Sequence, residues 1–202
     1  LLSFSLIHHQ SKEQPCTVVS LNGLNAPLLQ NLFVSGLGLT SVEALSTSTC
    51  LIHVDLSNNT ELLSISGLKS SAQTLETLNL EACSLLSSIE PLEGATGLQS
   101  INLKECTKLQ SLKPLLASQN LQKIILQGCA QIDSLEGLSS RELEPSGYHH
   151  FSLEGCTSLI SLRGLPHLSE EISTLYLQNM PALVSLDGIE VASAIEILDI
   201  DN

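Results

Sequence analysis

The sequence predicts an α/β solenoid, a curved arc in which about eight short strands form a parallel concave sheet. Turns and short 3₁₀ pieces are expected on the convex side. Two observations support this fold class. A pattern of apolar residues recurs about every 23 residues along most of the chain. Apolar residues make up 43% of the chain but aromatic residues only 2%, so one small packing arrangement of Leu and Ile is repeated many times.

The predicted strands lie in segments of the form Leu-x-x-Leu-x-Leu-x-x-Cys, as in residues 75–83. The segments in register have these central residues: Leu32, Val54, Leu78, Ile101, Ile124, Phe151, Leu175 and Leu198. The interval between neighbouring copies is nearly constant, except that it is longer between Ile124 and Phe151. A second half-repeat, Leu-x-Ser-Leu-x-Gly-Leu in residues 159–165, predicts a turn or short 3₁₀ piece before the next strand.

Alternation along each strand predicts which side chains form the core. Leu78 and Leu80 share one face and Asn79 lies on the other, so stacked repeats bury a Leu ladder that no single repeat could bury. The Asn or Cys that follows turns the chain away from the strand, and Cys packs there as a small apolar group with a weak donor. Leu37 and Met180 occupy this position without a donor, so we expect looser turns there.

The pattern Leu-x-x-Leu-x-Leu-x-x-[Asn/Cys]-x-x-Leu resembles the leucine-rich-repeat family over roughly residues 16–202. It is similar to the short internalin-type repeat with one residue added, and its Cys-containing copies are also similar to plant resistance-protein and other cysteine-containing repeats. The resemblance implies that an Asn at the turn bonds buried backbone groups. We expect residues 1–28 to be irregular or a degenerate first repeat, and residues 29–202 to be the repeat domain, incomplete at its C-terminus.

Three irregular stretches carry their own expectations. Residues 1–7 are compatible with a strand or with a remnant of a secretory apolar segment. Residues 139–148 hold the extra length and Pro-Ser-Gly, and should form a loop off the back or rim with the neighbouring strands in register. We expect further repeats or another subunit to cover the C-terminal edge, because a last strand leaves backbone groups unpaired.

Charge and motifs exclude several function classes. The formal net charge is -13, which disfavours nucleic acid as a partner. No apolar run approaches the ~20 residues that a membrane span needs. The sequence contains no P-loop, metalloprotease, nucleophile-elbow or dinucleotide motif, so we expect no catalysis and no cofactor.

The six cysteines and six histidines predict no metal site. Four cysteines, Cys83, Cys106, Cys129 and Cys156, follow the repeat spacing and are expected to be buried, reduced thiols. Reduced thiols favour an intracellular, cytoplasmic setting. An extracellular setting stays open, and there Asn58 would match the glycosylation pattern Asn-x-Thr.

The outward strand positions predict a partner-binding surface. Its candidate residues are Phe33, Asp55, Asn79, Asn102, Lys104, Lys123, Ile125 and Tyr176. Phe33, Ile125 and Tyr176 are apolar or amphipathic where polar groups would suffice, which is typical of interface anchors. Lys104 and Lys123 either receive an acidic side chain of a partner or balance Glu81 and Glu105.

These features predict a non-catalytic scaffold or adaptor that binds a protein on its concave face, as a subunit of a large assembly. Two alternatives remain. One is the ligand-sensing repeat module of an immune receptor or pathogen surface protein. The other is a regulatory or substrate-recruiting arm of an enzyme complex.

Overall fold

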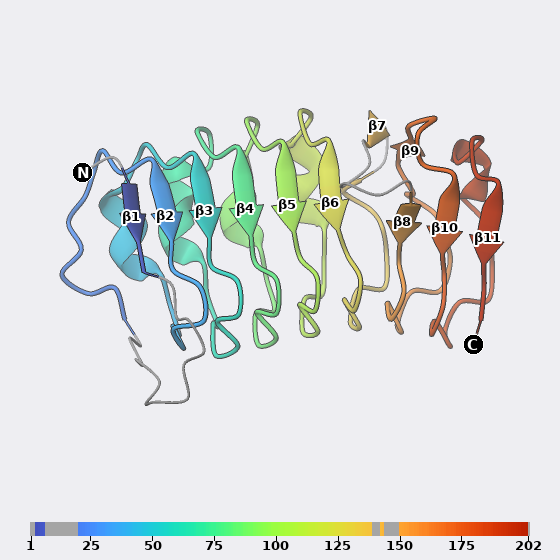
Figure 1. The fold of residues 1–202 in the computed structure, drawn as a ribbon, viewed down its shortest axis with the longest axis horizontal. Coiled ribbons are helices and arrows are strands. Elements are labelled where there is room, and N and C mark those ends of the chain that lie inside the picture. The colour runs from blue at the N-terminus through green and yellow to red at the C-terminus, as the bar shows by residue number, and fades with distance from the viewer. Residues whose placement is uncertain (1–2, 7–19, 139–141, 144–149, 202) are drawn as a thin grey trace.

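The chain is a solenoid, as the sequence predicts (Figure 1). The computed structural model describes residues 3–6, 20–138, 142–143 and 150–201. Successive repeats each place a short strand on one face, and several place a 3₁₀ helix behind it. Cys16 and the pair His8 and His9 lie outside the described residues.

The strands of successive repeats pair in parallel and lie side by side along the arc (Figure 1). The first six form one sheet: β1 (Ser3–Ser5), β2 (Asn31–Phe33), β3 (His53–Asp55), β4 (Thr77–Asn79), β5 (Ser100–Asn102) and β6 (Lys123–Ile125). Three more form a second sheet: β8 (His150–Ser152), β10 (Thr174–Tyr176) and β11 (Ile197–Asp199). Leu78 lies opposite Ile101, and Ile101 opposite Ile124, which confirms the predicted register.

Strand β1 adds a repeat that the spacing alone did not identify. Phe4 pairs with Leu32 in parallel, and the Leu6 N–H donates to the Phe33 carbonyl at 2.7 Å. Of the two interpretations of residues 1–7, the described part therefore has the strand conformation. Phe4 lies farther from Leu32 along the chain than the usual repeat interval, which is why this copy could not be recognised.

The convex side carries short 3₁₀ helices, each closely preceded by a serine. They are η1 (Glu43–Thr47), η2 (Ser66–Ser71), η3 (Glu90–Leu92), η4 (Lys113–Ala117) and η5 (Ile189–Val191). The Ser88 hydroxyl accepts the Glu90 N–H at 3.1 Å, and Ser111 accepts the Lys113 N–H at 3.2 Å. This local bond between a hydroxyl and an N–H two residues on explains the recurring serine of the second half-repeat.

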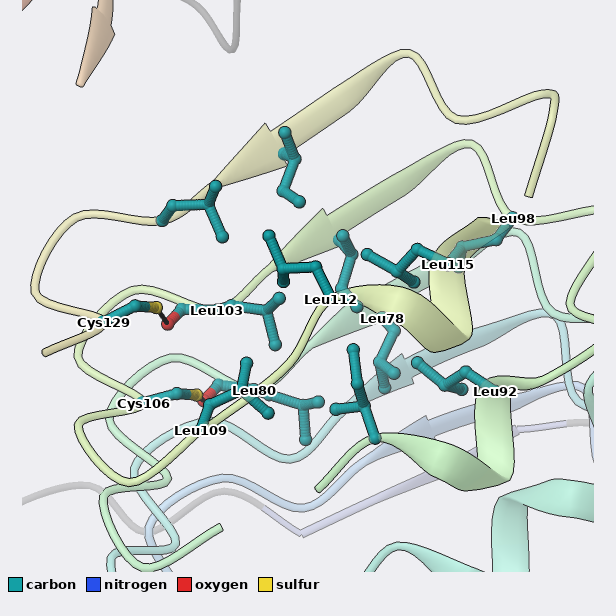
Figure 2. Packing of buried hydrophobic residues seen from close by; sticks show 14 of the residues in the cluster. Leu78, Leu80, Leu92, Leu98, Leu103, Cys106, Leu109, Leu112, Leu115 and Cys129 are labelled. Atoms are coloured by element: carbon teal, nitrogen blue, oxygen red, sulfur yellow. Dashed lines mark hydrogen bonds between the residues drawn. The ribbon is translucent and has the colours of Figure 1, made fainter. Parts of the chain in front are cut away.

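The core is a continuous ladder of aliphatic side chains between the strands and the convex side. Leu78 and Ile101 are almost fully buried, and Leu80 and Leu103 are completely buried. Figure 2 shows Leu78, Leu80 and Leu103 facing Leu92, Leu112 and Leu115 from the opposite side of the solenoid. The predicted core pairs are therefore confirmed, and among the described residues Phe151 is the one buried aromatic ring in an otherwise aliphatic layer.

The Asn/Cys position links each repeat to the one before it. Each buried thiol donates to a strand-end carbonyl of the preceding repeat: Cys106 to Leu80 at 3.1 Å and Cys129 to Leu103 at 3.1 Å (Figure 2). Cys83 and Cys156 make the same bond at 3.3 and 3.4 Å. The burial predicted for these four cysteines is confirmed.

Asn59 makes more bonds at this position than any thiol can. Its amide donates to the carbonyls of Val34 and Leu56, both at 2.8 Å. Its oxygen accepts the N–H groups of Leu37 and Leu39, both at 3.1 Å. The looser turn expected at Leu37 was therefore wrong, because the side chain that bonds the turn comes from the next repeat.

The strand ladder is interrupted at the extra residues between β6 and β8. Glu142–Leu143 forms β7, which pairs with β9 (His167–Leu168); the rest of residues 139–148 lies outside the described residues. Past the strands the register is kept, since the Gly128 N–H donates to the Glu154 carbonyl at 2.8 Å. The insertion thus leaves the turns in register but divides the expected sheet in two.

Candidate protein-interaction surface

The outward-pointing strand residues, together with those just after each strand, form one face, which we call the concave face. Six of the eight predicted site residues occupy the same place, the third residue of a strand. In chain order they are Phe33, Asp55, Asn79, Asn102, Ile125 and Tyr176. The first five lie directly opposite one another in neighbouring strands, so the structure brings them into one row.

Three members of this row also have a local structural role. The carboxylate of Asp55 accepts the Ser57 N–H at 2.9 Å, and Asn79 and Asn102 each accept the N–H two residues on. Such bonds end a strand by replacing its ladder with a side-chain turn. Asp55, Asn79 and Asn102 would therefore be favoured here even without a partner.

The two predicted lysines differ in their surroundings. The Lys104 ammonium lies 3.4 Å from the Glu81 carboxylate, and Asn102 donates to the same carboxylate at 3.1 Å. Balancing of Glu81, one of the two expectations for Lys104, is thus observed. Lys123 is exposed on β6.

The predicted anchors Phe33, Ile125 and Tyr176 are half-buried by their neighbours. The His150 ring meets the Tyr176 ring edge-on, with centroids 5.1 Å apart and planes at 74°. This arrangement holds the Tyr176 ring in place, which suits an anchor because little side-chain freedom is then lost on binding.

Two hollows lie along the concave face. The N-terminal one, of about 270 Å³, is lined by side chains of β2 to β5, including Phe33, Asp55, Asn79 and Asn102. The second, of about 260 Å³, lies where β6 and β8 part. We call it the break pocket; its lining residues are Glu81, Asn102, Lys104, Ile124, Ile125, Gln127, His150, Phe151, Ser152 and Ile172.

The break pocket contains residues that sequence reasoning missed. Phe151 was assigned to the core alone, Ile172 was not considered, and Glu81 and Ser152 were not singled out as binding residues. The signal in the sequence was the longer interval between Ile124 and Phe151. It indicated an insertion but did not show that the sheet opens there. Asn102 lines both hollows, which are therefore neighbours on this face.

The titratable groups of the described residues do not form a metal centre. In that part of the chain, no three His, Cys, Asp or Glu side chains are grouped to hold an ion. Burial raises the pKa of Cys83, Cys106 and Cys156 from 9.0 to about 12, and that of Cys129 further. Thiols held this firmly in the protonated form are poor nucleophiles and poor metal ligands. Among the described residues, no helix is long and apolar enough to cross a membrane.

The C-terminal end of the arc exposes apolar side chains. Leu198 of β11 is 38% exposed, whereas Leu175, at the same position one repeat earlier, is completely buried. Val184 and Ile197 are more exposed still. Glu196, Asp199 and Asp201 place negative charge beside this apolar edge.

Comparison with solved structures identifies the fold. The chain superposes on internalin C2 from Listeria monocytogenes with a TM-score of 0.53 and 18% identity, over 86% of this chain and 72% of that one. The fold is that of a leucine-rich-repeat protein. A second internalin of that organism, inlF, gives a TM-score of 0.42 at 17% identity over 83% of this chain and 65% of its own, a likeness too weak to argue from.

The leucine-rich-repeat likeness is one of fold and not of close relationship. No protein-family model and no curated protein sequence matches the chain.

Proposed function

We propose that this chain is a non-catalytic interaction module that holds a partner protein on its concave face, as a scaffold or adaptor within a larger assembly. The observation that carries the proposal is the aligned row from Phe33 to Ile125, whose members line two neighbouring hollows. Solenoids present long surfaces of this kind to protein partners. The absence of catalytic motifs from the sequence is in keeping with it.

The test compares the two faces of the solenoid. Lys123 lies exposed on β6 of the concave face, and Lys113 begins η4 on the convex side, where it pairs with Glu136 at 3.0 Å. The variants Lys123→Glu and Tyr176→Ala should weaken capture of the partner from a source-cell extract at least about tenfold. Lys113→Glu is the matched control and should retain capture. Equal loss on both faces would overturn the assignment to the concave face.

We also propose an intracellular, reducing setting for the module. Its support is the set of four buried thiols, none of which is joined in a disulfide in the described residues. The other expectation is an extracellular setting, in which Asn58 would accept a glycan. Asn58 is exposed at the turn after β3. Mass spectrometry of the protein from its own cells would decide, because a glycan on Asn58 would contradict the intracellular proposal.

A further inference from the structure

We propose that the break pocket binds an extended segment of a partner protein by one large apolar side chain, with a basic side chain of that segment lying toward β10 and β11. This inference rests on the proposed function and specifies the chemistry of the partner. It combines three features: a ladder hydrogen bond that is not formed between β6 and β8, an apolar floor to the pocket, and carboxylates beyond the pocket, Glu154 after β8 and Asp199 on β11.

The missing ladder bond is evident from the backbone hydrogen bonds that link neighbouring repeats. The residue after each strand donates its N–H to the last residue of the next strand, as Leu103 does to Ile125 at 2.9 Å and Leu153 to Tyr176 at 2.9 Å. The same bond is made by Leu6, Val34, Leu56, Leu80 and Leu177. Leu126 occupies this position after β6. In the described part of the chain its N–H does not donate to the carbonyl of Ser152, the last residue of β8. Leu126 lies between Ile125 and Gln127, which line the pocket, so the missing ladder bond marks the gap between β6 and β8 where the pocket lies.

The floor of the pocket consists of core residues at the place where β6 and β8 are not paired. Ile124, Phe151 and Ile172 line it and are at most 5% exposed, so the pocket offers an apolar surface backed by the core. Its volume of about 260 Å³ is below the roughly 300–1,000 Å³ of sites for drug-sized ligands, so one large side chain suits it better than a cofactor. Because the floor already belongs to the core, it is rigid and needs little reorganisation on binding.

Carboxylates on the β10 and β11 side of the pocket favour a basic neighbour for this apolar anchor. Glu81 is neutralised by Lys104, but among the described residues Glu154 accepts only the neutral amide of Gln127, at 2.6 Å. Asp199 likewise accepts the amide of Gln178, at 2.8 Å. No Lys or Arg occupies an outward position of β8, β10 or β11. A segment lying from the pocket toward β11 therefore meets carboxylates that the described residues leave without a cation, and a Lys or Arg of that segment complements them.

Synthetic peptides test this chemistry on the unaltered chain. The probe is a short Gly/Ser peptide carrying one Phe followed by two Arg residues, titrated into isotopically labelled protein and followed by NMR. We expect shifts at the Leu126 N–H and at Phe151. Replacing the Phe by Ser, or both Arg by Glu, should weaken binding about tenfold or more. Equal binding of the three peptides, or shifts confined to the hollow beside Phe33, would overturn the proposal.

A pair of serine variants provides the matched control. Ser152→Leu places a side chain in the break pocket, whereas Ser100→Leu alters the other hollow on β5. The first should reduce peptide binding about tenfold and the second should leave it unchanged, with circular dichroism reporting the fold of each. If Ser152→Leu does not fold, the three peptides still decide. Loss of partner capture in Lys123→Glu without any peptide selectivity would refute the pocket while leaving the proposed function standing.

Discussion

The six-stranded sheet from β1 to β6 and the three-stranded sheet of β8, β10 and β11 are built from one repeat but differ in how completely they are closed. In the first sheet, the central strand residues Leu32 to Ile124 are at most 3% exposed, and Phe4 of the edge strand β1 is partly buried. In the second, exposure rises from 0% at Leu175 to 38% at Leu198. The comparison shows that a repeat is buried by its neighbours and not by its own sequence.

The boundary between the two sheets separates two kinds of contact between repeats. At the break, the ladder bond from Leu126 to Ser152 is not formed, yet Gly128 still donates to Glu154 and Cys156 still donates to Leu126. The turn contacts therefore keep the solenoid in register across an insertion that the strand ladder does not survive. Because the strands part and the turns do not, the opening is confined to the concave face.

The largest expected effect tests the closure of the two sheets at one repeat position. Leu78→Ala removes a side chain that is 2% exposed and should cost about 2–5 kcal/mol of unfolding free energy through the lost burial and the cavity. Leu198→Ala, at 38% exposure, should cost less than about half as much. Urea unfolding followed by circular dichroism gives both values. Equal losses would mean that something outside this chain's own contacts determines burial at β11.

An intermediate effect is expected at the turn position, where the first sheet has Asn59 and the second has Met180. Asn59→Ala removes the acceptor of the buried N–H groups of Leu37 and Leu39 and should destabilise the chain by about 2–4 kcal/mol. Asn59→Cys should recover part of this, since a thiol can donate as Cys106 does. The control is Asn120→Ala at an exposed site, which should change stability by less than about 0.5 kcal/mol. A loss no larger than that control would show that the repeats do not depend on this link.

The smallest expected difference concerns the thiols, which make the same bond in both sheets. Cys83 and Cys156 should react with a thiol reagent equally slowly in the native state, and both more slowly than the half-buried Cys50. Timed labelling with mass spectrometry measures the order. Labelling of Cys156 well before Cys83 would show that the second sheet opens independently of the first.

The raised thiol pKa values also fix the sign of the pH dependence. A thiol whose pKa is about 12 when folded and 9.0 when unfolded binds more protons in the folded state between these values. Its contribution to stability is therefore complete below pH 9 and is lost as the pH rises toward 12. The denaturant midpoint of the chain should fall over this range.

The repeat, the positions of eight strands, the burial of their Leu ladder and the thiol row could all be predicted from the chain alone. They are predictable because two properties can be read along the chain itself. One is the repeat spacing of about 23 residues, and the other is the alternation of inward and outward side chains along a strand. The concave positions of Phe33 to Tyr176 followed from the same alternation.

Contacts between repeats became known only from the folded arrangement. The assignment of Asn59 to the preceding turn, the pairing of Glu81 with Lys104 and the parting of β6 from β8 all involve groups that are distant along the chain. The longer interval before Phe151 shows that the chain has extra length at one place, but not whether the ladder or the turns absorb the excess. That choice depends on the competition between strand hydrogen bonds and turn contacts across neighbouring repeats, and here the turn contacts were kept.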